Sequence, residues 1–412
     1  MPHFTGSAPE VPVFPVDAPS REPYHASMKS IRCGVIGVGN MGGYHARSLA
    51  EGRITRTTLT AVSDLDPAQM AQFPTVPGFP DSRALIRSGL VDAVIIATPH
   101  YAHTTVGADA LQQGLHVLVE KPISVHKSDC AQLVAAHANP RQVFAAMLNQ
   151  RTDPYFQKIR ALVRGGELGE LRRVSWTITD WFRTDAYYAS GGWRATWAGE
   201  GGGVLLNQAT HNLDLWQWMF GMPVRVRAVC GLGRHHNIEV EDDVTAIWEY
   251  ANGATGVFTT TTGEAPGTNR LEVAGDRGRL VYENSRICFA QTTGTVSDFC
   301  RQSSQHYARP AQTEQVFEFP DHGGQHAAIL QNFIDAILDG QALIAPAADG
   351  AGAVELANAM VWSSLRNEPV PLPLDAAGYA QQLRQLCAAS IFKKTTARKQ
   401  QDEIAPYLVK AK

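Results

Sequence analysis

Two short segments of the sequence hold a lysine and a histidine that could each assist the loss of a proton. Lys121 stands in VEKPIS, directly after the apolar run GLHVLV, and His211 stands in GEGGGVLLNQATHNLDLWQWMFG. An imidazole titrates near neutral pH and can accept a proton, while an ammonium can stabilise negative charge that develops on a hydroxyl. Either residue could instead be structural, Lys121 at the surface after a strand and His211 as a packed or capping residue.

A glycine pattern near residue 40 predicts a binding site for a dinucleotide. The segment GVGNMG has Gly37, Gly39 and Gly42 in GxGxxG spacing, after an apolar run and at the start of a helical pattern. In this context Gly37 permits a tight turn, Gly39 lets a pyrophosphate approach the backbone, and Gly42 allows close packing of helix on strand. The N–H groups around Asn40 and Met41 would then face the anion at the helix N-terminus.

The ends of the next predicted strands supply further candidates for this cofactor site. Asp64 ends the run TTLTAVSD, where a carboxylate accepts hydrogen bonds from a ribose diol and repels a 2′-phosphate. We therefore expect NAD rather than NADP, although Asp64 could also serve only as a turn or cap residue. Ligands of such sheets lie beyond the carboxyl ends of the strands. The other candidates for cofactor contact at that edge are Thr98, Pro99, His100, His103, Glu120 and Lys121.

The elements that must position these residues predict two domains. Near-continuous apolar runs alternate with helical patterns over residues 31–150, which predicts an α/β Rossmann domain with a parallel sheet. Over residues 151–375, strands rich in threonine and aromatic residues, with the Asn-Gly turn of YANGAT, predict an α+β domain on a large, open, mainly antiparallel sheet. Residues 1–30 are proline-rich and are expected to form a flexible extension, and 376–412 a C-terminal helix and charged tail.

Composition narrows the class of protein. The chain has 412 residues, of which 44% are hydrophobic and 18% charged, and this composition is typical of a globular protein. Its net charge of -3 gives no electrostatic reason to expect nucleic acid as a partner, and no apolar run approaches the ~20 residues of a membrane helix. The six cysteines are scattered without a CxxC pair, which argues against a metal site or disulfides and favours a reducing cytoplasm.

The segment around His211 favours the catalytic interpretation of both residues. Three glycines precede a predicted amphipathic helix, on which Asn207 and His211 are four residues apart and therefore neighbours. With a nicotinamide cofactor near Lys121, oxidation of a secondary alcohol requires the hydroxyl proton to leave as hydride leaves the carbon. The candidate catalytic residues are therefore Lys121, His211 and Asn207.

Three segments together make the chain resemble the Gfo/Idh/MocA family, the glucose–fructose oxidoreductase and inositol dehydrogenase group. They are GVIGVGNMGGYHARSL, VEKPIS and GGGVLLNQATHNLDLWQWMFG, and the resemblance extends over roughly residues 31 to 375. It implies a Rossmann domain, an open sheet that forms homodimers or homotetramers, and NAD(P)-dependent chemistry on sugars, inositols and their derivatives. It also implies that Lys121 is the motif lysine, that Glu120 lies by the nicotinamide ribose, and that His211 is the general acid/base.

One position departs from the pattern of that family. Many members carry an aspartate four residues before the histidine, where this chain has Asn207. A neutral amide can orient a hydroxyl or an imidazole, but it cannot stabilise an imidazolium as a carboxylate does. We therefore expect Lys121 and His211 alone to handle the proton.

Arginines and aromatic residues between the two chemical segments are candidates for contact with a substrate. Aromatic faces stack on the C–H face of sugars, and arginine donates forked hydrogen bonds to hydroxyls or to an anionic group. The same residues could instead support the sheet or an oligomer interface. The candidate substrate residues are Arg151, Tyr155, Tyr187, Trp193, Arg194, Asn207 and His211.

The predicted function is NAD-dependent oxidation of a secondary hydroxyl of a sugar, glycoside or cyclitol, and resemblance to some subgroups suggests a pyranoside 3-hydroxyl. One alternative is an NAD-dependent glycosidase, in which transient oxidation acidifies a neighbouring C–H and permits elimination of the aglycone. Another is a sensor that only binds NAD, as the yeast galactose co-repressor does. The presence of both Lys121 and His211 argues against the sensor. We expect a cytoplasmic enzyme with no metal and with neither a nucleic acid nor a membrane as partner.

Overall fold

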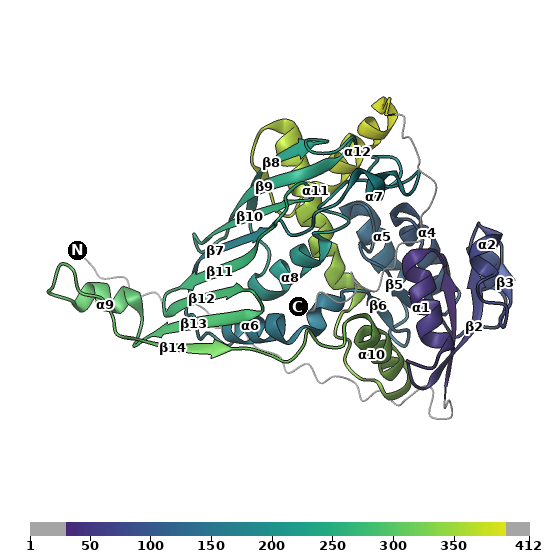
Figure 1. Ribbon diagram of the computed structural model, residues 1–412, viewed down its shortest axis with the longest axis horizontal. Helices are drawn as coiled ribbons and strands as arrows, with labels where there is room; N and C mark the ends of the chain where they lie inside the picture. The colour runs from purple at the N-terminus through teal and green to yellow at the C-terminus, as the bar shows by residue number, and fades with distance from the viewer. Residues whose placement is uncertain (1–29, 393–412) are drawn as a thin grey trace, which may run out of the picture.

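The computed structural model describes residues 30–392, which are built on two sheets that lie side by side (Figure 1). The first sheet has six strands in the order β3-β2-β1-β4-β5-β6, and the second has nine in the order β14-β13-β12-β11-β7-β10-β9-β8-β15. The predicted extension before residue 30 and the charged tail from residue 393 lie outside the described residues. The two sheets confirm the predicted fold class, a Rossmann domain followed by an α+β domain.

The first sheet is parallel throughout and has helices packed against it. Its strands β4 and β5, with the sequences AVII and HVLV, are buried along their whole length, as expected where helices cover both faces of a parallel sheet. The strands are β1 (Ile31–Ile36), β2 (Thr57–Ser63), β3 (Gly78–Phe79), β4 (Ala93–Ile96), β5 (His116–Val119) and β6 (Phe144–Ala146). The helices are α1 (Asn40–Ala50), α2 (Pro67–Met70), α3 (Ser82–Ile86), α4 (His100–Gln112) and α5 (Lys127–Ala136).

The second sheet is mainly antiparallel, except that β7 and β10 pair in parallel. Its strands are β7 (Leu171–Ile178), β8 (Arg225–Leu232), β9 (Glu241–Glu249), β10 (Thr255–Thr261), β11 (Asn269–Gly275), β12 (Gly278–Glu283), β13 (Arg286–Thr292), β14 (Gln312–Phe317) and β15 (Val370–Pro371). The helices that follow the first sheet are α6 (Pro154–Arg164), α7 (Asp185–Ala189), α8 (Thr210–Phe220), α9 (Val296–Gln302), α10 (Gln325–Asp339), α11 (Gly350–Arg366) and α12 (Ala376–Ala389). Two 3-10 helices are η1 (Asn149–Thr152) and η2 (Ala347–Asp349).

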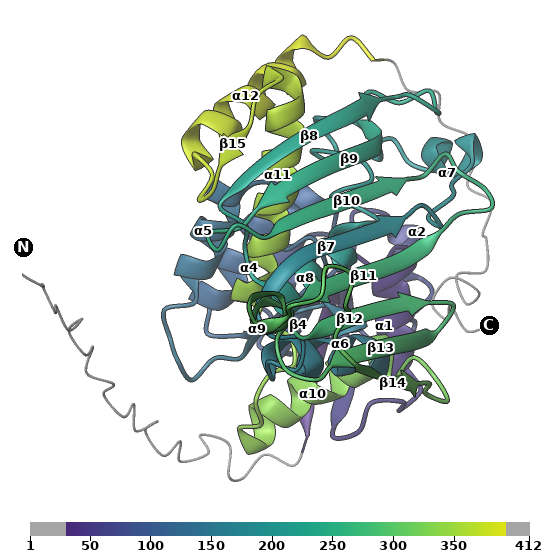
Figure 2. The same ribbon diagram turned by 90° about the vertical axis from the view of Figure 1, so that its left-hand side faces the viewer.

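Side chains of this sheet alternate between a buried and an outward face. On β9, Val244, Ala246 and Trp248 are fully buried, whereas Ile247 between them is 51% exposed. Helices α8 and α11 lie on the buried side, and the outward side faces the viewer in Figure 2. One covered and one open face is the usual arrangement of an antiparallel sheet.

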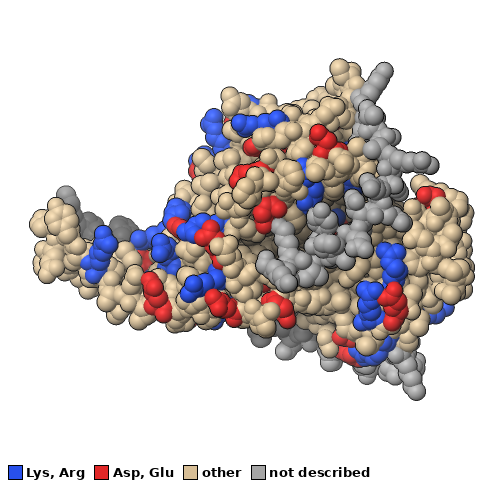
Figure 3. Space-filling view, in the orientation of Figure 1, with Lys and Arg blue, Asp and Glu red and all other residues tan. Residues whose placement is uncertain are grey.

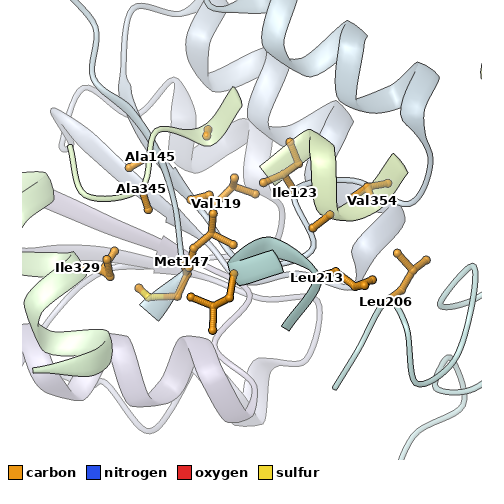
Figure 4. Packing of buried hydrophobic residues seen from close by; sticks show 14 of the residues in the cluster. Val119, Ile123, Ala145, Met147, Leu206, Leu213, Ile329, Ala345 and Val354 are labelled. Carbon is orange, nitrogen blue, oxygen red and sulfur yellow. The ribbon is translucent and has the colours of Figure 1, made fainter. Parts of the chain in front are cut away.

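A continuous hydrophobic core joins the two parts. Figure 4 shows Val119 and Ile123, from the end of the Rossmann sheet, close to Leu206, Leu213 and Val354 of the second part. Helix α11 contacts α8 and β8 and also α5 of the first part. The predicted boundary near residue 150 falls in η1, and the division into domains stays a prediction, because the core runs across that boundary. This shared packing fixes the carboxyl edge of the Rossmann sheet against the start of α8.

The surface shows no segregation of charge on the face drawn in Figure 3, where Lys and Arg side chains lie among Asp and Glu side chains. Ion pairs between exposed or half-exposed side chains include Arg56–Asp339 and Arg87–Asp109. Within residues 30–392, no helix combines the length and the apolar composition that crossing a bilayer requires.

Candidate active site

Lys121 lies at the cofactor edge of the Rossmann sheet and contacts the segment that leads into α8. It lies two residues after β5, and its Nζ donates a hydrogen bond of 2.7 Å to the backbone carbonyl of Asn207. His211 is the second residue of α8, four residues beyond Asn207. The lysine and the histidine, 90 positions apart in the sequence, thus approach the same turn of the chain.

Asn207 precedes the helix instead of lying on it, which corrects the predicted helix start. Helix α8 begins at Thr210, and residues 204–209 form consecutive turns in which the N–H of Asn207 bonds to the carbonyl of Gly203. The glycine run before it is required for packing. A Cβ at Gly201 would lie 2.0 Å from Val125 of the Rossmann part, and one at Gly203 would lie 1.9 Å from the carbonyl oxygen of Glu241.

Burial sets the protonation of the two candidate catalytic groups. Burial lowers the pKa of Lys121, and the carboxylates of Glu120 and Glu200 oppose that shift. Burial and the positive charge of Lys121 hold the pKa of His211 well below its ordinary value. His211 is therefore neutral at neutral pH, and its Nδ1 has no hydrogen-bond partner among the described residues. A neutral imidazole has one unprotonated ring nitrogen, which can accept a proton.

Two further histidines lie close to this pair, and neither was among the residues predicted from the sequence. His45 of α1 has its Nε2 2.7 Å from Oε1 of Glu120, in a fully buried contact. Burial would raise the pKa of Glu120, but the contact with His45 and the charges of His326 and Lys121 lower it to about 2. His326 of α10 is also buried, and burial lowers its pKa to about 4. The segment GYHARSL contains His45, whereas no local pattern marks His326.

The glycine loop has the geometry that a pyrophosphate requires. Gly37 has φ +82, and a Cβ at Gly42 would lie only 1.7 Å from the carbonyl oxygen of Gly37, so both positions exclude a side chain. At Gly39, by contrast, no heavy atom of the described residues lies within 4 Å of an added Cβ. Gly39 caps α1 without a side-chain hydrogen bond, and Asn40 and Met41 are the first two residues of that helix. Open space in front of uncapped N–H groups fits an anionic ligand.

Asp64 accepts hydrogen bonds from the glycine loop and can still accept others from a ribose. Its Oδ2 accepts a hydrogen bond of 2.8 Å from the N–H of Val38, and its Oδ1 accepts one of 2.9 Å from the N–H of Asp66. A carboxylate has about four acceptor sites, so two of them stay free for the hydroxyls of a ribose. The turn role and the cofactor role of Asp64 are therefore compatible.

The end of β4 and the start of α4 hold two candidates for cofactor contact that differ in their hydrogen bonding. The hydroxyl of Thr98 is buried and has no hydrogen-bond partner in the part of the chain that the structure describes, and Pro99 caps α4 next to it. His103, however, has its ring nitrogens 2.7 Å from the carbonyl of Pro122 and 2.8 Å from that of Thr98. The buried ring of His103 lies between these two carbonyls and, being neutral, can donate a hydrogen bond to only one of them, so cofactor contact by His103 stays a prediction.

Three of the predicted substrate residues gather beside the same edge. The guanidinium of Arg194 donates to the hydroxyl of Tyr187 at 2.7 Å and lies over the rings of Tyr187 and Trp193, 4.5 Å and 4.8 Å from their centroids. Trp193 packs edge-on against His100, at 5.5 Å between ring centroids. His100 in turn bonds to the carbonyl of Glu200. The aromatic cluster therefore lies against the Rossmann part, near Lys121.

Two predicted substrate residues have structural roles instead. The guanidinium of Arg151 is 1% exposed and pairs with the carboxylates of Asp214 and Asp349 at 2.7 Å each. The hydroxyl of Tyr155 bonds to the backbone of Phe319, and its residue is 2% exposed. Arginine and tyrosine suit a core ion pair as well as a substrate pocket, so residue type alone gave the wrong assignment for this pair.

The six-stranded parallel sheet and its glycine cradle, joined to a large open sheet, define the protein as an NAD-binding oxidoreductase. One family model, described as an oxidoreductase family with an NAD-binding Rossmann fold, matches residues 31–147. A second, the GFO/IDH/MocA C-terminal domain, matches residues 156–281. The chain belongs to the Gfo/Idh/MocA family.

Known proteins share both the sequence pattern and the fold. Inositol 2-dehydrogenase of Rhizobium meliloti is 25% identical over 342 residues, which are 81% of this chain and 97% of that protein. The solved WlbA dehydrogenase of Bordetella pertussis, in complex with NADH and UDP-GlcNAcA, has a TM-score of 0.69 at 23% identity and covers 84% of this chain and 100% of its own. Levoglucosan dehydrogenase with NADH and levoglucosan has a TM-score of 0.67 at 21% identity, with coverage of 84% and 100%.

Proposed function

We propose that the protein oxidises a secondary hydroxyl of a sugar, glycoside or cyclitol, with NAD as the electron acceptor. The observation that carries this proposal is the hydrogen bond from Lys121 to the carbonyl of Asn207. That contact connects the cofactor edge of the Rossmann sheet with the turn that leads to His211. It brings an ammonium and a neutral imidazole to one side of the sheet, where the reactive ring of a dinucleotide would lie.

The chain's own residues account for the movement of the proton. Lys121 donates a hydrogen bond to the substrate hydroxyl and stabilises the negative charge that grows on its oxygen. His211 is neutral because burial and Lys121 lower its pKa, so its unprotonated ring nitrogen is available to take the hydroxyl proton. Bound NAD supplies the acceptor for the hydride that leaves the substrate carbon. The glycine loop, Asp64 and Thr98 hold the cofactor in a position where the substrate carbon that loses the hydride faces it.

The aromatic cluster supports a carbohydrate or cyclitol as the substrate class. Tyr187 and Trp193 provide flat apolar faces and Arg194 a hydrogen-bonding fork, beside Lys121. The inositol, levoglucosan and UDP-GlcNAcA in the names of the relatives and solved neighbours are all polyhydroxylated rings. A ring with several hydroxyls would use both kinds of contact, and a pyranoside 3-hydroxyl remains our specific proposal for the reacting group.

We also infer a homodimer or homotetramer that forms through the open face of the second sheet, in the cytoplasm. That face exposes apolar side chains, among them Val229 at 69% and Ile247 at 51%, and exposed apolar clusters often mark an interface. All six cysteines of the chain, each within the described residues, are free thiols, as suits a reducing compartment.

A substrate panel tests the proposed reaction. The enzyme is incubated with NAD and, separately, with myo-inositol, levoglucosan, glucose, methyl glucosides and UDP-sugars, and NADH is followed by its absorbance. NADH formation with one ring class, and its loss in His211→Ala, supports the proposal. Release of aglycone from an aryl glycoside with catalytic NAD and no net NADH would show the glycosidase reaction instead. NAD binding without any turnover would contradict both enzymatic proposals.

A further inference from the structure

Glu200 is a buried carboxylate that lies directly against Asn207. The residue is 1% exposed. Its Oε1 accepts a hydrogen bond from Nδ2 of Asn207, and its Oε2 accepts one of 2.5 Å from the N–H of Ala195. Its backbone carbonyl accepts a further hydrogen bond of 3.2 Å from Nδ1 of His100, on the cofactor edge. Glu200 is therefore fixed through both its side chain and its backbone.

The contact with Glu200 determines which way the amide of Asn207 faces. An ionised carboxylate only accepts hydrogen bonds, so Asn207 must turn its NH2 group toward Glu200. The amide oxygen is then left as the group that Asn207 can offer to a substrate hydroxyl or to Lys121. An asparagine without such a partner could present either end.

Glu200 and Lys121 meet at Asn207, because Nζ of Lys121 donates to the backbone carbonyl of Asn207 and Nδ2 of Asn207 donates to Glu200. Burial lowers the pKa of Lys121, and the carboxylates of Glu120 and Glu200 raise it again. Burial raises the pKa of Glu200, while Arg194, the N–H of Ala195 and Asn207 favour its ionised form. Among the described residues, the charged and titratable groups that interact with Lys121 include Glu120, Glu200, Arg183, Arg194, His100, His103, His211 and His326.

We propose that Glu200 and Asn207 together replace the single aspartate that many members of the family carry at position 207. Glu200 supplies the negative charge to Lys121, and Asn207, oriented by Glu200, supplies the acceptor at the reaction centre. Glu200 is thus a positioning residue. This inference rests on the proposed function for the role of Lys121 in the reaction, but the effect of Glu200 on the charge of Lys121 is independent of any substrate.

Moving the carboxylate from one position to the other tests the inference. Glu200→Gln removes the charge and leaves an amide–amide contact. Asn207→Asp alone sets two carboxylates against each other, so that they compete for one proton. The double variant Glu200→Gln/Asn207→Asp again has one carboxylate and one amide, but the carboxylate is now at position 207 and the amide at position 200. This places the charge where many members of the family carry an aspartate.

The primary readout is the pH at which Lys121 becomes reactive, followed by pH-dependent labelling with acetic anhydride and mass spectrometry. Glu200→Gln is expected to shift the labelling midpoint of Lys121 down by about one pH unit, and the double variant to shift it back. With the panel compound that gives the most NADH, Glu200→Gln should lower kcat/KM roughly tenfold to hundredfold, with the basic limb of the pH profile moved in the same direction. The double variant should exceed both single variants in kcat/KM.

Glu239→Gln is the matched control, because Glu239 accepts a hydrogen bond from the N–H of Trp197, in the same segment, without contacting Asn207. It should leave the labelling midpoint of Lys121 in place. If Glu200→Gln also leaves the midpoint in place, or if the double variant does not restore it, the inference is wrong. If the midpoint moves and recovers as stated but no panel compound is oxidised, the proposed function fails while the role of Glu200 stands.

Discussion

His45 and Glu120 form a buried pair next to Lys121, with 2.7 Å between Nε2 and Oε1. The pair holds the carboxylate that precedes Lys121, and it helps to keep the pKa of Glu120 at about 2 despite burial. It therefore fixes a negative charge at the position where the nicotinamide ribose is expected.

Removing His45 should cost stability, because it leaves that buried carboxylate without its partner. We expect His45→Ala to lower the free energy of unfolding by about 2 kcal/mol, measured by urea denaturation at pH 7. His45→Gln, whose amide can still donate a hydrogen bond, should recover part of the loss. Equal stability of the alanine variant and the unmodified protein would show that the pair contributes nothing.

Two glycines of the cofactor loop should respond to alanine in different ways. Gly42→Ala places a methyl group 1.7 Å from the carbonyl of Gly37, so we expect it to destabilise the fold by about 3 kcal/mol or more. Gly39→Ala adds a methyl group to open space, so the melting temperature should stay nearly constant while NAD binding weakens roughly tenfold or more. Thermal unfolding and calorimetric titration with NAD measure the two effects, and tight NAD binding by Gly39→Ala would contradict the pyrophosphate assignment.

Lys121→Met tests whether the lysine acts on the substrate or on the cofactor. Methionine keeps the length and apolar stem of the side chain but removes the ammonium, so we expect kcat/KM to fall roughly a thousandfold. Binding of NAD should change by no more than a few fold, because the glycine loop and Asp64 remain. Lys127→Met, at a lysine that pairs with Glu355, is the matched control. Full turnover by Lys121→Met would remove the lysine from the mechanism.

Glu241 should make stability fall as the pH rises through the weakly acidic range. Burial raises its pKa from 4.5 to about 7, so between these values the folded state keeps a proton that the unfolded chain has released. This contribution of Glu241 to the free energy of unfolding is complete below pH 4.5 and is lost above pH 7, and it amounts to about 3 kcal/mol.

Substitution of Glu241 isolates this effect. The side chain of the Glu241→Gln variant is uncharged at every pH. The unmodified protein should therefore lose free energy of unfolding relative to this variant between pH 5 and pH 8, as measured by urea denaturation. Glu51→Gln, at a half-exposed position, should give a difference that is constant with pH. A constant difference for Glu241→Gln as well would contradict the raised pKa.

Local patterns were sufficient to predict the parts of the site that lie within one short segment. The spacing of Gly37, Gly39 and Gly42, and the position of Lys121 after a buried strand, depend on neighbours in the sequence. The strands and helices of the Rossmann part were predictable for the same reason, since their apolar runs are nearly continuous. The short elements α2, β3 and α3 carry few buried residues and gave no comparable signal.

The remaining features depend on contacts between distant segments. His326 approaches Lys121 only because α10 packs against η1 and the Rossmann edge. Glu200 meets Asn207 through a run of turns whose glycines fit against Val125 and Glu241. Arg151 was predicted to contact a substrate, but it pairs with Asp214 in the core. The sequence around an arginine does not show whether its partner is a distant carboxylate of the same chain or a ligand.

Because β7 pairs with β10 and β11, which come later in the chain, β7 is exposed while the chain is being synthesised. Strand β7 lies in the middle of the second sheet, but its neighbours β10 and β11 begin only at Thr255 and Asn269. Until those residues have left the ribosome, β7 has two unpaired edges and an apolar face that carries Trp176, a combination that favours aggregation. We therefore expect chains truncated before Thr255 to accumulate as insoluble material, however complete their Rossmann half is.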